Sequence, residues 1–442
     1  LHIMRKFTVF TLVMFFALLA SGLSQTLNLR FNNAFYTWKR VDSLTGSNAD
    51  ATYTTHLKGY QNLAFDLNFG KWTLSSFVQT DEDIINKIDR GFSFRFYDAY
   101  LKGNNLFNVL DLKLGRQYVS AGSGRGTIDG AHFKLKLGDR KQYQIVGYGG
   151  YLTPLAYDFQ GYKQLKDNFL AGGQFLYYGV KDLSVGLSYA MKRRGMDPYY
   201  TIRPDELFNP KVVYIETESK SEQIAGADVS YRINKKHNVF GRAYYDINMK
   251  KLYKAEINGN FALTDKVKFS VGYYYKQPQI SYNTIFWVFN YKKYQEVEAG
   301  IDYAARIFGT DANVYGRFGG VFYESDNSLK FQFGVSNPWY GLGVVKYTGY
   351  AGETEGAFGY FNHDLYKNQF VLTSNLSYSR YNLGNYNADK VDVFSGALGL
   401  TYRPVNHFSI DAQGQFMTNE IYKFDTRFLL GFNLWLFTNF NK

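Results

Sequence analysis

One stretch of the chain, residues 91–137, contains a complete copy of the pattern that decides the fold: GFSFRFYDAYLKGNNLFNVLDLKLGRQYVSAGSGRGTIDGAHFKLKL. Apolar residues alternate with polar ones in three runs, at 92–97, 110–114 and 131–137. Side chains on a β-strand point to opposite faces in turn, so each run has one apolar face and one polar or charged face. In a soluble protein the apolar face packs on a second layer, whereas in a membrane barrel it meets lipid and the polar face lines the lumen.

Runs of this kind recur from residue 27 to the C-terminus, and the connections between them alternate in length. Tight turns such as 138–140 and 264–266 are separated by long polar connections such as 152–167 and 196–222. Outer-membrane barrels have short periplasmic turns and long extracellular loops, whereas a soluble sandwich has no reason to sort its loops by length. We therefore predict an all-β fold: a single transmembrane antiparallel up-and-down β-barrel with an even number of strands, about 18–22, and no plug domain.

Two later segments carry separate expectations. Residues 282–294 fit either a free loop or a strand that projects above the membrane, because their apolar positions stay in phase with the run that follows. The last run alternates Phe and Leu, at positions 428, 430, 432, 434 and 436, with Arg427, Leu429, Gly431, Asn433 and Trp435, and Phe437 and Phe440 lie at its end. This terminal run resembles the C-terminal sorting signal of bacterial outer-membrane proteins, although Asn441 and Lys442 follow the last aromatic residue, Phe440.

The N-terminus has the features of a secretory signal peptide. A basic segment, Met4 to Lys6, precedes an apolar segment at 7–20, and small residues lead to Ser24 and Gln25. The alternative, a membrane anchor, is disfavoured because about 14 apolar residues are fewer than the roughly 20 that a spanning helix needs. We predict a signal peptide over residues 1–24, cleavage between Ser24 and Gln25, and an outer-membrane barrel over residues 25–442 of a Gram-negative cell.

The composition is consistent with this class of protein. The 442 residues include 40 Tyr, 39 Phe and 42 Gly, which suit strands, interfacial aromatic girdles and turns. The absence of cysteine excludes a disulfide framework and a thiolate metal site or nucleophile. A formal net charge of +12 suggests anionic partners, among which lipopolysaccharide, nucleic acid and an anionic solute come into question. We expect lipopolysaccharide and an anionic solute, together with the barrel-assembly machinery that inserts the chain, and no nucleic acid.

A short motif resembles a known family. Leu114-Gly115-Arg116-Gln117, followed after a glycine-rich segment by Ile128-Asp129-Gly130, is similar to the porin-like barrels of the alginate-export type. The resemblance covers about a tenth of the chain. In that family the barrel is a passive conduit with a basic lumen for an anionic polysaccharide. The resemblance implies passive export or diffusion, and it does not identify the solute.

The polar face of the predicted strands carries about two basic residues for each acidic one, which favours anions in the way that rings of Arg and Lys do in anion pores. Lys192, Lys254 and Lys276 are among these basic residues. Alternatively, the charges are paired within a solvated wall or bind lipopolysaccharide. The candidates for anion preference are Arg95, Lys113, Arg116, Lys134, Lys136, Arg242, Arg306, Arg317 and Lys346.

Among these candidates, we expect Arg95 and Lys134 to contribute most, because both lie in the middle of a strand. Arg116 is a special case: strict alternation with Leu112 and Leu114 points it outward, unless a bulge at Gly115 turns it inward.

The glycine-rich segment 121–126 invites a phosphate-loop interpretation. It lacks the Gly-Lys-Ser/Thr ending and no helix follows, so we expect a flexible extracellular loop. No His-Glu-x-x-His or Gly-x-Ser-x-Gly motif occurs, and we expect no cofactor, no metal site and no enzyme activity.

These features predict a porin-like channel for passive passage of small or polymeric, anionic solutes through a net-basic lumen. One alternative is a non-catalytic barrel that serves as a scaffold or accessory of a secretion or surface machine. A lesser alternative is a barrel lipid hydrolase, and a soluble secreted β-protein is the rival to the membrane prediction itself.

Overall fold

The structure, a computed structural model, describes residues 26–41, 53–86, 92–159, 161–162, 164–195, 199–204, 207–215, 221–278, 293–324, 326–349, 352–367, 369–382, 390–418 and 425–440. The predicted signal peptide and residues 282–292 lie outside the described residues. The predicted cleavage site and the single barrel domain therefore remain predictions.

Nearly all of the described residues lie in strands. The strands are β1 (Thr26–Val41), β2 (Tyr53–Phe69), β3 (Trp72–Ile85), β4 (Ser93–Leu106), β5 (Leu110–Ala121), β6 (Gly124–Leu137), β7 (Tyr143–Leu152), β8 (Asn168–Tyr177), β9 (Leu183–Arg194), β10 (Tyr199–Pro204), β11 (Pro210–Ile215), β12 (Glu222–Ile233), β13 (His237–Asp246), β14 (Lys251–Ala262), β15 (Val267–Lys276), β16 (Tyr294–Ile307), β17 (Thr310–Tyr323), β18 (Asn327–Ser336), β19 (Tyr340–Gly349), β20 (Glu353–Tyr366), β21 (Phe370–Asn382), β22 (Val391–Val405), β23 (Phe408–Thr418) and β24 (Asp425–Asn439). A single 3₁₀ turn, η2 (Leu165–Asp167), precedes β8 within the described ranges.

The sheet closes on itself. Over the described part of the chain, 22 strands form one sheet in which neighbours along the chain pair, β9 pairs with β12, and β1 pairs with both β2 and β24. This connectivity is that of a closed antiparallel up-and-down barrel, which confirms the predicted fold class and even strand number. The remaining strands, β10 and β11, form a separate hairpin within the predicted long connection 196–222.

No helix among the described residues is long and apolar enough to cross a membrane.

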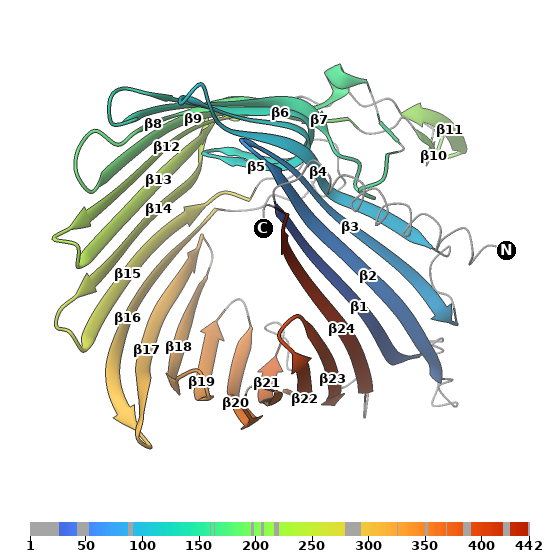
Figure 1. The fold of residues 1–442 in the computed structure, drawn as a ribbon, viewed down its shortest axis with the longest axis vertical. Helices are drawn as coiled ribbons and strands as arrows, with labels where there is room; N and C mark the ends of the chain where they lie inside the picture. The colour runs from blue at the N-terminus through green and yellow to red at the C-terminus, as the bar shows by residue number, and fades with distance from the viewer. Residues whose placement is uncertain are drawn as a thin grey trace. The chain divides into compact units, whose positions relative to one another are not determined.

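The described residues group into two compact units. The first unit contains those within 1–104, 260–271 and 297–442, and the second unit contains those within 105–259 and 272–296. In the first unit, β24, β1, β2 and β3 lie side by side, so the two ends of the sheet meet there (Figure 1). In the second unit, β5 to β9 follow one another in the same way and lead to β12 and β13.

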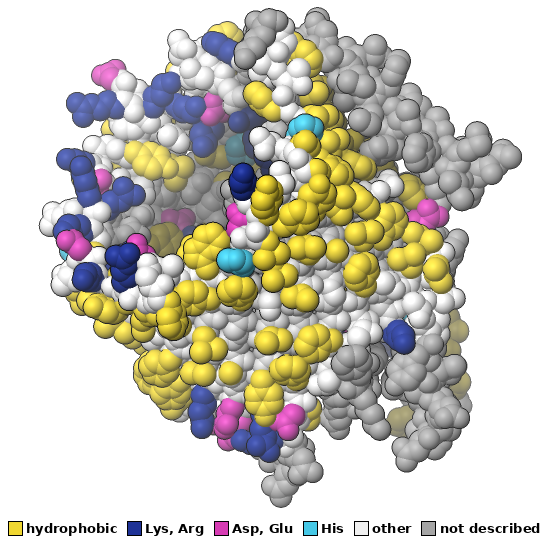
Figure 2. All heavy atoms as spheres, turned by 60° about the horizontal axis from the view of Figure 1, so that its bottom comes forward, with side chains coloured by type: hydrophobic (Ala, Val, Ile, Leu, Met, Phe, Trp, Pro, Cys, Tyr) yellow, Lys and Arg dark blue, Asp and Glu magenta, His cyan; other side chains and the backbone are white. Residues whose placement is uncertain are grey.

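Each strand has one apolar and one polar face, as the alternation predicts. On β19, Leu342 is 61% exposed, and on β9, Leu187 is 56% exposed whereas its neighbour Ser188 is buried. Figure 2 shows hydrophobic side chains gathered over a broad surface, with charged side chains along its edges. Large apolar side chains that stay exposed at alternate positions of many strands are typical of a surface that meets lipid. We call this side of the strands the apolar face and the opposite side the polar face.

On the polar face of the first unit, side-chain amides form a row across the strands that close the sheet. Asn32 on β1 donates to Asn433 on β24 at 2.6 Å, and Asn62 on β2 donates to Asn32 at 3.0 Å. Gln79 on β3 donates to Asn62 at 2.9 Å. This amide row therefore adds side-chain hydrogen bonds to the backbone register at the closing pair of strands.

Candidate functional site

The glycine-rich segment is the turn of a β5–β6 hairpin that packs on the polar face of the second unit. The backbone N–H of Ser123 donates to Ser188 Oγ on β9 at 3.0 Å, and Ser123 Oγ donates to the carbonyl of Ile224 on β12 at 3.1 Å. The hydroxyl of Tyr244 on β13 donates to the carbonyl of Gly122 at 2.9 Å. The turn is thus bound to three strands, and the expectation of a flexible loop is wrong, whereas its extracellular location remains a prediction.

The glycines of this segment are required because the turn lies very close to the side chains of neighbouring strands. Gly122 has a φ of +56°, and a Cβ there would meet the side chain of Ser188. A Cβ at Gly124 would overlap the ring of Tyr148. The sequence pattern that suggests a mobile loop therefore has another cause, which is that the hairpin lies against the wall with no room for side chains.

Apolar side chains hold the hairpin against its neighbours. A buried cluster joins residues of the hairpin to residues of β7 and β8, and its members are Val119, Ala121, Ile128, Val146, Tyr148, Leu152 and Leu170. Ile128 is fully buried at 0% exposure. Burying one large aliphatic side chain stabilises a protein by about 1.5–3 kcal/mol, so several such residues fix the hairpin in place.

Arg116 lies at the base of the hairpin and is 2% exposed. Its guanidinium binds the Asp129 carboxylate through two bonds of 2.8 and 3.0 Å, and donates to the carbonyls of Tyr157 and Asp158 at 2.7 and 2.9 Å. It also donates to the Tyr162 hydroxyl at 2.6 Å. β5 pairs with β6 across Gly115 without a register shift, so Arg116 stays on the same face as Leu114, as strict alternation predicts.

Since these contacts use the guanidinium fully, Arg116 fixes the connection after β7 to the hairpin. In that connection, burial raises the pKa of the Tyr162 hydroxyl, and the hydrogen bond and charge of Asp129 act in the same direction.

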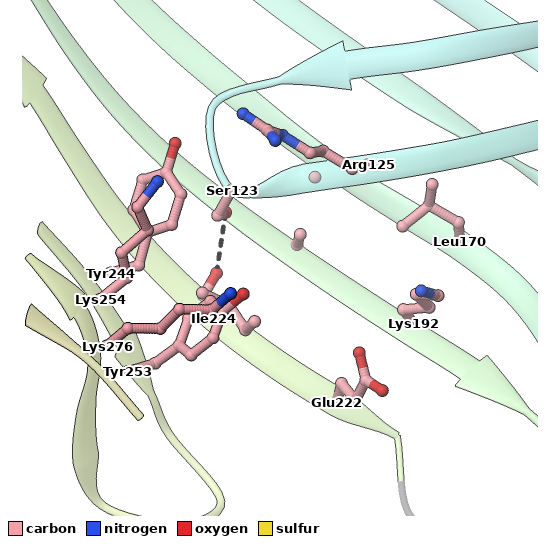
Figure 3. A pocket seen from close by; sticks show the side chains of 12 residues that line it. Ser123, Arg125, Leu170, Lys192, Glu222, Ile224, Tyr244, Tyr253, Lys254 and Lys276 are labelled. Carbon is pink, nitrogen blue, oxygen red and sulfur yellow. Dashed lines mark hydrogen bonds between the residues drawn. The ribbon is translucent and has the colours of Figure 1, made fainter. Parts of the chain in front are cut away.

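Beside the hairpin turn lies a pocket of about 280 Å³, which we call the basic pocket. It is lined by Ser123, Gly124, Arg125, Leu170, Ala190, Lys192, Glu222, Ile224, Tyr244, Tyr253, Lys254 and Lys276. Figure 3 shows Ser123 at the turn, with Tyr244, Lys254 and Lys276 on one side of it and Leu170 and Lys192 on the other. Every lining residue belongs to the second unit.

The basic pocket has more cations than carboxylates. Lys254 forms an ion pair of 2.8 Å with Glu256, and Lys192 lies opposite Glu222 in the strand register. Arg125 and Lys276 have no carboxylate partner within the described residues. Four cationic side chains line a concave site with one carboxylate among them, which favours the binding of an anion.

The sequence places Lys192, Lys254 and Lys276 on the polar face, and all three line the basic pocket. It does not reveal Arg125, because the glycine-rich segment reads as a loop. The absence of a side chain at Gly122, Gly124 and Gly126 is the signal that could have indicated a hairpin packed against a wall.

Most of the nine candidates for anion preference are paired with carboxylates. Arg95 binds Asp81 at 2.8 Å, and Asp81 is only 3% exposed. The other ion pairs are Arg116 with Asp129, Lys136 with Asp111, Arg242 with Asp228, Arg317 with Asp302 and Lys346 with Glu355. A paired charge contributes less to the field at the face than an isolated one, so these residues are weaker candidates than the lining of the basic pocket.

The remaining candidates have different surroundings. Arg306 donates to the carbonyl of Gly309 at 3.2 Å, in the turn between β16 and β17. Lys113 lies opposite His132 in the register of β5 and β6. Lys134 forms no ion pair with any described residue. The contribution of all nine residues to anion preference remains a prediction.

Among the described residues, no group of three or more His, Asp or Glu side chains is placed to hold a metal ion.

No protein-family profile matches the chain, and no curated protein matches it. Several solved structures are similar in fold. The P pilus usher (PapC) translocation pore gives a TM-score of 0.46 at 10% identity, covering 93% of this chain and 99% of that one. OccAB4 of Acinetobacter baumannii gives 0.43 at 10% identity, with 94% and 99% covered, and OpdQ of Pseudomonas aeruginosa gives 0.43 at 10% identity, with 93% and 97% covered. Likenesses this weak do not identify a function.

Proposed function

We propose that the protein is a porin-like channel of the outer membrane that passes small anionic solutes passively. The observation that carries this proposal is the division of the strands into two faces. Large hydrophobic side chains stay exposed on the apolar face of a closed 22-stranded sheet, whereas charges and amides occupy the polar face of its described residues. A sheet of this kind is stable with lipid on the apolar face and water on the polar face, which then lines the lumen.

The basic pocket gives the channel its preference for anions. Many charged side chains on the strands outside the pocket form ion pairs. In contrast, Arg125, Lys192 and Lys276 line the basic pocket beside the β5–β6 hairpin. A charge in a partly enclosed site is screened less by salt than a charge on an exposed loop. Solute selection therefore depends on the basic pocket more than on the two residues first expected, Arg95 and Lys134.

The resemblance of residues 114–130 to the alginate-export type supports passive transport, and it extends the solute class to anionic polysaccharides. Within that motif, however, Arg116 and Asp129 are bound to each other and to the connection after β7. The motif thus has a structural role in this chain, and the part that would contact a solute is the lining of the basic pocket.

The test is a planar-bilayer recording of the purified protein in a salt gradient. We expect steady single-channel conductance and a reversal potential that shows anion preference, strongest at low salt, where the Debye length is about 30 Å at 0.01 M. The variant Lys192→Gln with Lys276→Gln should lose most of that preference and keep its conductance. A matched control is Lys346→Gln, since Lys346 lies in an exposed pair outside the pocket.

A barrel that inserts but carries no current would contradict the channel and support the scaffold or accessory role. Esterase or phospholipase activity in detergent would support the lipid hydrolase. Recovery of the protein in soluble form without detergent would remove the membrane assignment altogether.

A further inference from the structure

The first unit has a concave site of different chemistry on its polar face. A cleft of about 270 Å³, which we call the amide cleft, lies across β21 to β24. It is lined by Asn375, Ser395, Gly396, Ala397, Gln413, Gln415, Phe416, Met417, Asp425 and Arg427. Asn375, Ala397, Gln415 and Arg427 stand in one row of the strand register. The short side chain of Ala397 stands between the longer ones of Asn375 and Gln415, which hollows the row.

The lining of the amide cleft is electrically balanced. Its two charged residues, Arg427 and Asp425, bind each other at 2.7 Å. A free anion would meet the Asp425 carboxylate and the carbonyl oxygens of the amides, so the cleft offers an anion no excess of attraction. The lining thus selects for hydrogen-bonding capacity rather than for charge.

The hydrogen-bonding groups of the amide cleft both donate and accept. Gln415 donates to Gln413 at 2.7 Å, which leaves the carbonyl oxygen of Gln415 and the NH₂ group of Gln413 for a ligand. Ser395 shares a bond of 2.7 Å with Ser377. Asp425 is 2% exposed, and its Oδ1 atom has no hydrogen-bond partner among the described residues. A buried carboxylate oxygen without a partner is costly, so a donor from a ligand would stabilise it.

Aromatic rings flank the amide cleft on the side of β1. Arg427 donates to the Tyr36 hydroxyl at 3.1 Å, and Trp38 lies opposite Arg427 in the strand register. The rings of Tyr36 and Trp38 stack with their centroids 5.4 Å apart, and the rings of Trp38 and His56 stack at 5.3 Å. The faces of aromatic rings carry partial negative charge and attract weakly positive C–H groups.

We propose that the amide cleft binds a neutral polyhydroxylated ligand, such as one ring of a sugar. Hydroxyl groups donate and accept, which matches the mixed lining, and one of them donates to the open oxygen of Asp425. The C–H face of the ring packs beside Tyr36 and Trp38. With a volume of about 270 Å³, the cleft has room for a single sugar ring.

The test is calorimetric titration of the folded protein in detergent with two matched probes, D-glucose and D-glucuronate. Wild type is expected to bind glucose in the millimolar range with a change in Trp38 fluorescence. The variant Asn375→Ala with Gln415→Ala should weaken glucose binding at least tenfold, and Trp38→Phe should remove the fluorescence change. Gln332→Ala is the control, because this amide of β18 does not line the cleft.

If the double alanine variant does not fold, as judged by heat-modifiable mobility on gels, Gln415→Glu replaces it, since it keeps the shape and adds a charge next to Asp425. The inference is overturned if wild type does not bind glucose, or if binding survives both variants.

The outcome is separable from that for the proposed function, because binding in detergent does not require conduction. A channel that conducts but does not bind glucose would contradict only the proposal for the amide cleft. Glucose binding without any current would contradict only the proposal that the protein is a channel.

Discussion

The basic pocket and the amide cleft occupy similar volumes, about 280 and 270 Å³, on the polar faces of the second and first units. One is lined by four cations and one carboxylate, and the other by amides, a serine and a neutralised ion pair. The comparison shows that the barrel pattern requires only polarity at alternate positions. The kind of polar residue is free to vary, so one fold carries a pocket lined by cations and a cleft lined by amides.

The largest effect is expected from a variant that loosens the β5–β6 hairpin beside the basic pocket and leaves the amide cleft unchanged. Arg116→Met would leave the Asp129 carboxylate without its guanidinium, and breaking a buried pair in this way costs about 3–5 kcal/mol. We expect the β5–β6 hairpin to loosen and glucose binding in the first unit to persist. Glucuronate, an anion that we expect to bind in the basic pocket, should no longer bind. Denaturant unfolding and titration with both probes measure these effects.

The double variant Arg116→Met with Asp129→Leu is the control, since replacing both charges by apolar groups restores much of the stability lost. Equal loss of glucose and glucuronate binding in Arg116→Met would contradict the assignment of the two sites to separate supports.

The second prediction reverses the charge of the basic pocket. Lys192→Glu with Lys276→Glu changes its charge by four units and leaves the hairpin contacts intact. We expect glucuronate affinity to fall by more than about tenfold, which corresponds to about 1.4 kcal/mol, and the reversal potential to move toward cation preference. Glucose affinity should stay the same. An unchanged reversal potential would place the selective residues elsewhere.

The third prediction tests the role of the Arg427 guanidinium in the amide cleft. Arg427→Lys keeps the positive charge, but a single ammonium group does not reproduce the planar fork that bridges Asp425 and Tyr36. Glucose affinity should fall about threefold, a smaller loss than that caused by removing the amides, because the charge balance is kept. An increase in glucuronate binding at this site would show that charge, and not shape, governs the cleft.

The smallest effect is expected where neither site is touched. Lys346→Gln breaks an ion pair with Glu355 in which both side chains are at least half exposed. Exposed pairs contribute about 0–1 kcal/mol, so stability, selectivity and binding of both probes should stay within error of wild type. A clear loss of anion preference in this variant would show that paired charges outside the basic pocket determine the selectivity.

The fold follows from the sequence because the membrane imposes a strict alternation. Leu342 and Leu187 are exposed on the face that the pattern assigns to lipid. The 22 strands of the sheet fall within the predicted range because short polar segments separate the alternating runs. The β10–β11 hairpin is harder to predict from the sequence, because it lies inside a connection whose polar composition resembles that of a loop.

The candidate sites follow from the sequence only in part. Alternation assigns a face to each residue, and it correctly places Lys192 and Lys276 on the polar face. It does not tell which charges are neutralised, as Arg95 is by Asp81, because cross-strand pairing depends on register between strands. Nor does it show that Arg125 reaches a pocket, because the inward packing of a hairpin depends on contacts with distant strands.

The amide row at the closing strands has a consequence for how the protein is made. Asn32 and Asn433 are 401 positions apart, so the bond between them cannot form until residue 433 has been synthesised. Bringing together ends this far apart costs about 5 kcal/mol of chain entropy before any contact repays it. Until then, β1 has an unpaired edge that is prone to join other chains. We therefore propose that a helper protein shields this edge until the amide row has formed.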